Sequence, residues 1–472
     1  MRSDAARRSR RGGKAARRIG ITVAVTAALA ALLAAATPLA SLTAPDSPVA
    51  DAAMRRDGAK LRLLLKQGAD VNAAQGDGMT ALHWAATHGD VEEARMLIYA
   101  GARVDALTRN GNYTPLHLAS RAGHVAAIRA LLETGADANA KTSSGGATPL
   151  HFAAAQGNTE SIAALLDKGA TVDAREGAWE QTPLMWAAAY NRVSAIKALI
   201  ERGANIAAVS KVEDIPTRER ADRAAAQLRN RRIAALKAAE QPPRPAGAAG
   251  VADSARTAGT PNAPRDSAAP RDRSAADRPR GDSAAARPPR DSSAVPGARG
   301  NATANRPATS DSSRRDERAI SYGELVGNKG GLTPLLFAVR QGNTTAAMTL
   351  LDAGAKIDQV SDGDQTSPLL MATVNGHFDL AMKLLARGAD PKLASAAGAT
   401  PLYATINVQW AAKSLYPQPT AQKQQETTYL ELMEALLEAG ADPNARLTKH
   451  LWYMSYNFDL LGVNTTGATP FW

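Results

Sequence analysis

The chain has 472 residues, contains no cysteine and carries a formal net charge of +11. The absence of cysteine excludes disulfides and thiolate metal sites, so the stability of the fold must come from packing. The positive charge is concentrated in three segments, with +7 in residues 1–18, +4 in residues 217–240 and +5 in residues 242–319, which leaves −5 for the rest. Because most of the chain is mildly acidic, we expect no nucleic-acid partner.

The N-terminal residues 1–45 are predicted to be a signal peptide or an N-terminal anchor. Eight Lys or Arg residues and one Asp fall within residues 1–18, and an apolar run of 18 residues follows from Ile19 to Ala36. This order is typical of a secretory signal peptide. An uncleaved membrane anchor is the alternative, since 18 apolar residues are just enough to span a bilayer. In either case the rest of the chain is exported, and its richness in alanine and arginine indicates a bacterial protein of the periplasm or the cell exterior.

Two short motifs recur along the rest of the chain. The first is a phrase of the type Thr-Pro-Leu-His, which is repeated every 34 residues from Thr80, Thr114, Thr148 and Thr182. The second is Gly-Ala-Asp or a near variant preceded by two apolar residues, and it begins at Gly68, Gly101, Gly135, Gly169, Gly203, Gly354, Gly388 and Gly440. A fixed period of this length indicates stacked structural repeats, each of which buries its apolar face against its neighbours.

Each repeat predicts two short helices. Thr114 is placed to cap a first helix, and Pro115 suits its first turn because proline lacks an N–H group and already has a helical φ. Gly123 ends that helix. A second helix is predicted from about Ala126 to Thr134, and Gly135 can adopt the left-handed conformation that terminates it. A hairpin finger then leads to the next repeat.

These motifs resemble the ankyrin repeat. The resemblance implies a mainly α fold, a solenoid of helix-turn-helix units with β-hairpin fingers, interrupted here by a disordered insertion. We identify repeats one to five in residues 46–211 and repeats six to eight in residues 320–472. A ninth repeat only begins at Thr469. Because solenoids need polar terminal repeats for solubility, we expect the sequence to be a fragment of a longer chain, with a very short final cap as the alternative.

The long interruption has two parts. Residues 212–240 are basic and rich in helix-forming residues, with only a thin apolar stripe, so we predict a helix on the solenoid or projecting into solvent. Residues 241–319 consist largely of Pro, Ala, Arg, Asp, Ser and Gly, and too little apolar surface is present to offset the entropy of ordering. Because the interruption falls at a finger, we expect repeats five and six to stack beneath it. Two separate arms are the alternative.

Two shorter insertions are predicted within the last repeats, at about residues 410–427 and 446–467. The second is aromatic and contains Trp452, Tyr453, Tyr456 and Phe458. Exposed aromatic residues often anchor interfaces, so this segment is a second candidate for contact with a partner. The alternative is that it packs against further repeats of a longer chain.

The sequence predicts no enzyme, cofactor or metal site. His83, His117 and His151 are spaced by 34 residues, which places them one repeat apart, too far for their rings to share a metal ion. The resemblance implies instead that they hydrogen-bond at the starts of the helices. Ser194 and Lys197 match a Ser-x-x-Lys pattern, but the repeat register explains Ser194 and no accompanying motif is present.

The resemblance also implies where a partner protein docks, namely on the concave face made by the fingers and the exposed ends of the first helices. Trp84 and Trp186 are assigned to core positions. The binding residues implied on the fingers are Met79, Tyr113 and Trp179, and those at the ends of the first helices are Thr87, His88, Arg121, Gln156, Tyr190, Arg340, Gln341 and Asn375.

The function expected is therefore an exported scaffold that binds a partner protein through this face. One alternative is the targeting portion of a larger enzyme or redox protein that continues beyond Trp472. Another is a cell-envelope tether, in which the arginine-rich linker makes weak contacts with anionic envelope polymers. Membrane contact is expected only through the N-terminal segment.

Overall fold

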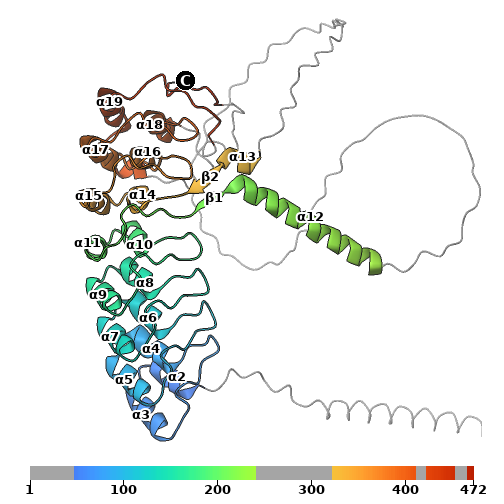
Figure 1. Ribbon diagram of the computed structural model, residues 1–472, viewed down its shortest axis with the longest axis vertical. Coiled ribbons are helices and arrows are strands. Elements are labelled where there is room, and N and C mark those ends of the chain that lie inside the picture. Colours follow the sequence, from blue (N-terminus) through green and yellow to red (C-terminus); the bar gives the residue numbers. More distant parts are fainter. Residues whose placement is uncertain (1–46, 241–320, 411–420, 452–464, 472) are drawn as a thin grey trace, which may run out of the picture. The chain divides into compact units, whose positions relative to one another are not determined.

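The computed structural model describes residues 47–240, 321–410, 421–451 and 465–471 (Figure 1). The predicted export signal, the linker from residue 241 to 319 and the aromatic residues from Trp452 to Phe458 lie outside the described residues. Contacts divide the chain into two compact units. One comprises residues 1–224 and 320–472, and the other comprises residues 225–319.

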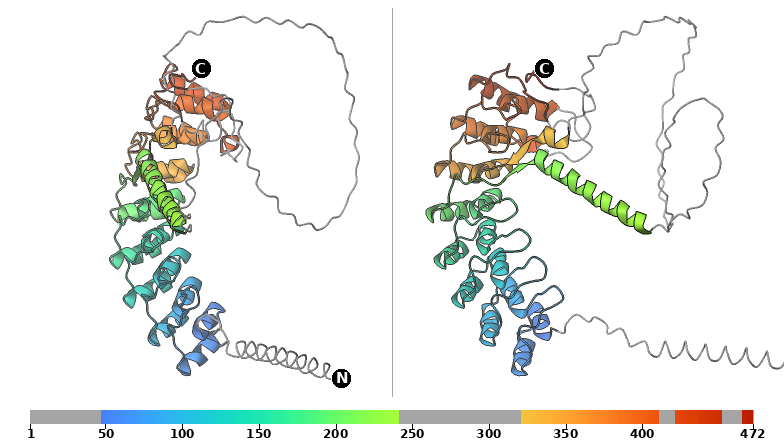
Figure 2. Two further views of the ribbon diagram at one scale, coloured as in Figure 1. Left: turned by 90° about the vertical axis from the view of Figure 1, so that its right-hand side faces the viewer. Right: turned by 45° about the vertical axis from the view of Figure 1, so that its right-hand side comes forward.

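The first unit contains a series of helix pairs, and Figures 1 and 2 show the two helices of each pair in separate rows. The first helices are α2 (Pro48–Met54), α4 (Ala81–His88), α6 (Pro115–Ala122), α8 (Pro149–Gln156), α10 (Pro183–Ala189), α14 (Pro334–Arg340), α16 (Pro368–Val374) and α18 (Pro401–Trp410). The second helices are α3 (Gly58–Lys66), α5 (Val91–Tyr99), α7 (Val125–Glu133), α9 (Thr159–Asp167), α11 (Val193–Glu201), α15 (Thr344–Asp352), α17 (Phe378–Ala386) and α19 (Tyr429–Glu438). The mainly α architecture of stacked repeats is confirmed.

The ends of the helices follow the local sequence. The Thr114 hydroxyl accepts a hydrogen bond from the His117 N–H, and Pro115 begins α6. Gly123 ends α6 in the left-handed conformation, with φ of 77°. The second helix α7 begins and ends within one residue of the predicted bounds, and Gly135 after it has φ of 91°. Capping and glycine chemistry therefore set both helices of this repeat.

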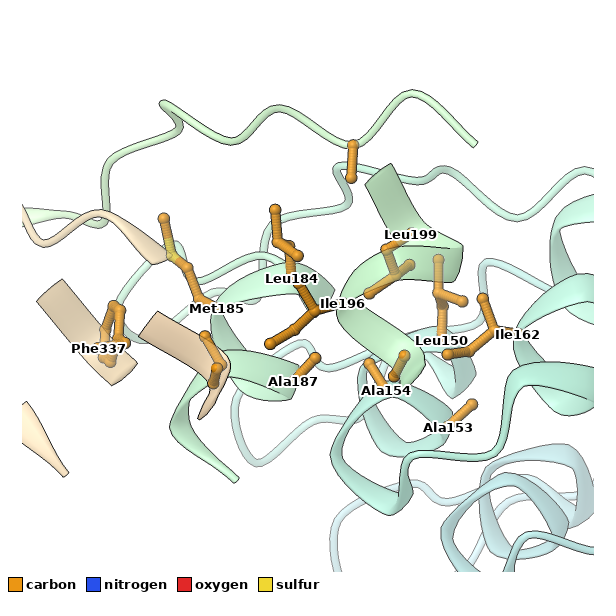
Figure 3. Packing of buried hydrophobic residues seen from close by; sticks show 14 of the residues in the cluster. Leu150, Ala153, Ala154, Ile162, Leu184, Met185, Ala187, Ile196, Leu199 and Phe337 are labelled. Carbon is orange, nitrogen blue, oxygen red and sulfur yellow. The ribbon is translucent and has the colours of Figure 1, made fainter. Parts of the chain in front are cut away.

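One apolar core runs through the stack. First helices contact first helices and second helices contact second helices of the neighbouring repeats. Leucine and isoleucine side chains such as Leu150, Ile162 and Leu184 are completely buried, and small residues such as Ala153 and Ala187 let the first helices approach closely (Figure 3). Burial of one leucine or isoleucine side chain contributes about 1.5–3 kcal/mol, so the stack is held mainly by this core.

The fingers are hydrogen-bonded turns. In the finger before α8, the Thr142 N–H donates to the Ala147 carbonyl at 3.1 Å, and the Ala147 N–H donates to the Thr142 hydroxyl at 3.0 Å. Neighbouring fingers are joined through the backbone, since the Ser143 N–H donates to the Gly111 carbonyl at 2.9 Å. These bonds give the fingers a fixed spacing along the stack.

Repeats five and six stack directly on each other. Helix α10 contacts α14, and α11 contacts α15. The Asn343 side chain at the start of α15 donates to the carbonyls of Ala188 and Ala189 at the end of α10, both at 2.9 Å. His124 and Arg192 form the corresponding contacts between other repeats. Repeats five and six therefore form one continuous stack, and the alternative of two separate arms is wrong.

The long insertion leaves and rejoins the first unit through a short antiparallel ribbon. Strand β1 (Val212–Asp214) pairs with β2 (Asn328–Gly330), with Val212 opposite Gly330. Helix α12 (Ile215–Glu240) follows β1, and the short helix α13 (Tyr322–Val326) precedes β2. The Glu219 carboxylate in the first turns of α12 accepts the Gly323 N–H at 2.8 Å. The two ends of the insertion are therefore held side by side.

After its first turns, helix α12 is exposed to solvent. Leu228, Ile233 and Leu236, which form its thin apolar stripe, are all exposed to solvent. Its basic residues give it the positive charge noted in the sequence. No helix among the residues that the structure describes is both long enough and apolar enough to cross a membrane.

The last repeat carries the two shorter insertions. A 3-10 helix, η1 (Ala421–Gln424), precedes α19. Between η1 and α19, the N–H groups of Glu426 and Thr427 donate to the Asp379 carboxylate. Beyond α19, the Thr465 N–H donates to His450 Nδ1 at 3.2 Å. The ends of the second insertion thus lie together, at a small cluster that includes Leu447 and Leu451.

Candidate protein-binding face

The fingers and the first helices together form one surface, which we call the finger-side face. Counted from the capping Thr or Ser of a first helix, the fourth and the eighth residues lie on the same side of the helix. In repeats two to seven the first of these positions forms an inner row of Trp84, Leu118, Phe152, Trp186, Phe337 and Met371. The second forms an outer row of His88, Ala122, Gln156, Tyr190, Gln341 and Asn375. Most of the binding residues implied at the helix ends belong to the outer row.

Aromatic rings join neighbouring repeats on this face. The ring of Tyr113, on a finger, lies 5.9 Å from that of Phe152 on α8, measured between centroids. Phe152 in turn lies 5.6 Å from Trp186 on α10, in an edge-to-face arrangement. Such ring pairs contribute about 0.5–1.5 kcal/mol each beyond their buried area. Tyr113, Phe152 and Trp186 form a continuous aromatic strip over three repeats.

The assignment of Trp84 and Trp186 to core positions is confirmed only in part, since Trp84 packs against the core cluster without belonging to it. Both rings are only half-buried, at the edge of the core, while Leu82 and Leu184, two residues earlier in each helix, are completely buried. The Trp84 indole N–H donates to the Gln75 side chain on the preceding finger at 2.8 Å. The sequence does not distinguish core positions from finger-side positions here, because these helices are apolar on most sides. Alanines fill the rest of the buried side, and the large ring lies on the finger-side face.

Cationic side chains lie over several rings of the face. The Arg121 guanidinium lies 5.6 Å from the centre of the Tyr113 ring, and Lys329 Nζ lies 5.4 Å from the centre of the Trp179 ring. The Arg340 guanidinium lies 5.0 Å from the Phe337 ring. Cation–π contacts of this kind contribute about 0.5–1 kcal/mol at exposed sites and orient the long side chains.

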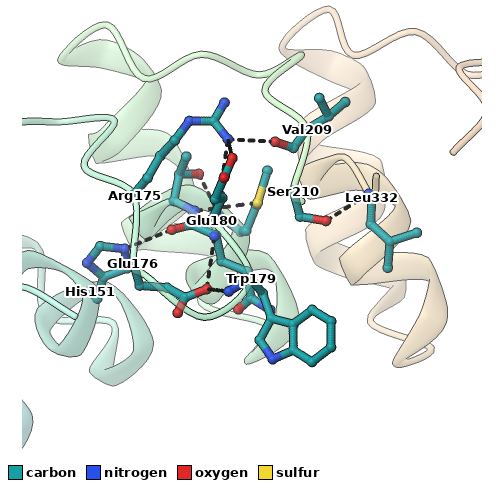
Figure 4. Close-up of polar contacts among 11 residues, drawn as sticks. His151, Arg175, Glu176, Trp179, Glu180, Val209, Ser210 and Leu332 are labelled. Atoms are coloured by element: carbon teal, nitrogen blue, oxygen red, sulfur yellow. Dashed lines mark hydrogen bonds and ion pairs between the residues drawn. The ribbon is translucent and has the colours of Figure 1, made fainter. Parts of the chain in front are cut away.

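Trp179 lies on a finger whose backbone is held by several hydrogen bonds (Figure 4). The buried Glu176 carboxylate accepts the N–H groups of Ala178, Trp179 and Gln181 at 2.7, 2.6 and 3.1 Å. The Trp179 carbonyl accepts the Lys211 N–H from the next finger at 2.7 Å. The indole itself remains 41% exposed. A fixed backbone with an exposed aromatic side chain is suited to contact with a partner.

The remaining implied site residues fall into two groups. Arg121, Gln156, Tyr190, Arg340 and Gln341 are exposed, and Tyr190 is 59% accessible. Met79, Thr87, His88, Tyr113 and Asn375 are half-buried. Within the second group, the Thr87 hydroxyl donates to the His83 carbonyl, the His88 ring lies against Trp84, and the Asn375 amide donates to the Met371 carbonyl. The exposed group is therefore the part of the face most accessible to a partner.

The structure adds residues that the sequence did not indicate as part of this face. Phe152 and Trp186 complete the aromatic strip, and their common position four residues after the capping threonine is a signal that could have identified them. Lys329 joins the face from beyond the long insertion, whereas Phe337, at the same position on α14, is buried in the core. No local sequence signal places Lys329 over Trp179.

The three periodic histidines link adjacent repeats. In each, a Thr N–H donates to Nδ1, as from Thr148 to His151 at 3.2 Å, so the ring proton is on Nε2. The Nε2–H of His151 donates to the Gln181 carbonyl at 3.0 Å, and His117 makes the same contact with Ala147 at 3.2 Å. Burial lowers the pKa of His117 and of His151 to about 4. These histidines are neutral structural groups at neutral pH.

Within the described residues, no group of three or more His, Asp or Glu side chains is placed to hold a metal ion.

Two comparisons bear on what the fold is. A family model described as ankyrin repeats in three copies matches residues 50–142, 138–210 and 318–395, which together make up just over half of the chain. A search among curated proteins finds no significant match.

Proposed function

Because the chain belongs to the ankyrin-repeat family, whose repeats generally serve as protein–protein interaction modules, we propose that it is an exported scaffold that binds a partner protein through the finger-side face. The observation that carries the proposal is the exposure of Trp179, Tyr190 and Arg121 on that face. Tryptophan, tyrosine and arginine are the residue types most enriched at the energetic centres of protein interfaces.

Export is the second element of the proposal. It is supported by the basic segment and apolar run of residues 1–36. A chain that carries residues 1–45 should be found in the periplasm or the medium, whereas a chain that lacks them should stay in the cytoplasm. Cell fractionation of the two chains checks this, and cytoplasmic retention of the full chain would refute the export proposal.

Replacing Trp179 and Tyr190 together with alanine is expected to abolish capture of the partner. Loss of two exposed aromatic anchors removes about 2–4 kcal/mol each in a typical interface, enough to reduce the affinity by at least a hundredfold. The measurement is a pull-down from envelope extract with the full chain as bait, followed by mass spectrometry.

A matched control is available on the second helices. Leu63 on α3 and Tyr99 at the end of α5 are 55% and 97% exposed, so the Leu63→Ala, Tyr99→Ala variant also loses one exposed aromatic and one exposed apolar side chain. This control should capture the same proteins as the unmodified chain. Equal capture by the Trp179→Ala, Tyr190→Ala variant would refute binding through the finger-side face.

A further inference from the structure

The finger-side face of repeats three to six carries a row of cations, although the chain outside its three basic segments is mildly acidic. Each finger from repeat three to repeat six carries at least one cation, and two first helices carry an arginine in their last turn. These cations are Arg109, Arg121, Lys141, Arg175, Lys211, Lys329 and Arg340. The finger after repeat six carries Asp362 and Asp364 instead, which marks the end of the basic region.

The acidic side chains on these fingers make ion pairs or hydrogen bonds, as Asp105 does with Arg103 and Asp173 with the Asn205 N–H. Glu176 accepts three backbone N–H groups of its own finger, and Glu180 pairs with Arg175 at 3.4 Å. Glu213 pairs with both Arg218 and Lys329. By contrast, the ion pairs found among the described residues include none that involves Arg121, Lys141, Lys211 or Arg340. Four cations of the face therefore have no anionic partner among the described residues.

The aromatic strip lies between these cations. Tyr113, Phe152 and Trp186 belong to repeats three to five, while Arg121 and Arg340 belong to repeats three and six. First helices pack about 8–10 Å apart, so three repeat steps separate the two arginines by roughly 24–30 Å. That distance equals about 16–20 residues of α-helix or about 7–9 residues of extended chain. A single short segment could therefore span both arginines and cover the strip.

Taken with the proposed function, on which this inference rests, the geometry points to an acidic polypeptide segment as the occupant of the basic region. Its carboxylates would meet Arg121, Lys141, Lys211 and Arg340, and its apolar side chains would cover the strip from Tyr113 to Trp186. Charge complementarity of this kind raises association rates and selects among partners. The chain's own residues 242–319 carry a net charge of +5, so they do not complement the region.

Single-stranded nucleic acid is also acidic, but the rings do not suit it. Bases bind to proteins by stacking on open aromatic faces. Here Arg121 lies over the Tyr113 ring and Lys329 over the Trp179 ring, while Phe152 and Trp186 meet edge to face. Ring edges and covered faces accept aliphatic and aromatic side chains of a polypeptide more readily than a stacked base.

The test is selection from a displayed library of random peptides of about 16 residues, with the full chain as the target. We expect the enriched peptides to be rich in Asp and Glu together with aromatic or aliphatic residues, and their affinity to fall as salt is added. The Arg121→Glu, Arg340→Glu variant should bind these peptides at least about tenfold more weakly. Circular dichroism verifies that each variant is folded.

The matched control carries the same change of charge at Arg129 on α7 and at Lys168, which directly follows α9, as Arg129→Glu and Lys168→Glu. It should bind the peptides as the unmodified chain does. Enrichment of neutral or basic peptides, or of none, would overturn the acidic class. If neutral peptides are enriched and are lost with Trp179→Ala and Tyr190→Ala, the proposed function stands while this inference fails. An oligothymidylate of about 20 nucleotides that binds more tightly than the peptides, with the same loss in the Arg121→Glu, Arg340→Glu variant, would assign the region to nucleic acid instead.

Discussion

Lowering the pH from 7 to 5 is expected to reduce the free energy of unfolding by about 4 kcal/mol through His117 and His151 alone. Burial holds the pKa of each ring at about 4 in the folded chain, against an ordinary value of 6.5. The unfolded chain therefore binds protons first as the pH falls below 6.5, and stability that is complete above that pH is lost progressively toward pH 4. Each ring contributes about 2 kcal/mol of this loss between pH 7 and pH 5.

Burial is the main cause of the lowered pKa, and the hydrogen bond that Nδ1 accepts also favours the neutral ring. A protonated ring could no longer accept the Thr114 or Thr148 N–H, which would leave a buried donor unpaired. Urea titrations followed by circular dichroism at pH 7, 6 and 5 measure the effect. The control is His117→Leu with His151→Leu, since leucine stands at the same position in repeats six and seven as Leu336 and Leu370. This variant should lose most of the pH dependence, and an unchanged slope would contradict the assignment.

Replacing Gly330 with alanine is expected to destabilise the chain by about 3 kcal/mol or more. Gly330 has φ of 92°, and a β-carbon there would overlap the Lys211 carbonyl oxygen, which belongs to the backbone and cannot move aside cheaply. The same carbonyl accepts the Gly331 N–H at 3.1 Å. The substitution should therefore open the β1–β2 ribbon and loosen the contact between repeats five and six.

The Gly354→Ala variant measures the cost of the left-handed backbone without the steric overlap that Gly330→Ala creates. Gly354 has a similar φ of 96°, but nothing lies within 4 Å of its would-be β-carbon. Its substitution should cost only about 1 kcal/mol. Urea titration compares the two variants, and hydrogen exchange at Leu332 and Ser210 reports on the ribbon. Equal stability of the two variants would show that the ribbon does not contribute to the stack.

Most of the fold can be predicted because its signals are local. Thr114, Pro115 and Gly123 specify the start and end of a helix within a few residues, and the period of 34 residues repeats that information. Stacking across the long insertion could also be inferred, since Leu199 and Phe337 would otherwise lack partners, and both are buried.

The face could be predicted only in part, because its details depend on contacts between distant segments. The implied positions of Trp179, Tyr190 and Arg121 are exposed. The half-burial of Trp84 could not be inferred, since a helix that is apolar on most sides does not show which side faces the fingers. The contact of Lys329 with Trp179 joins residues on opposite sides of the insertion, and only the pairing of β1 with β2 creates it.

The ribbon has a consequence for how this chain tolerates change. Because Val212 and Gly330 pair directly, the insertion leaves and rejoins the stack at one point. The closure entropy of a flexible loop between two such points grows only with the logarithm of its length. Halving or doubling that loop should alter the free energy of unfolding by only about 0.6 kcal/mol. A chain cut within it would still have a complete repeat-to-repeat interface available, so its two halves, produced separately, should reassemble as a split protein.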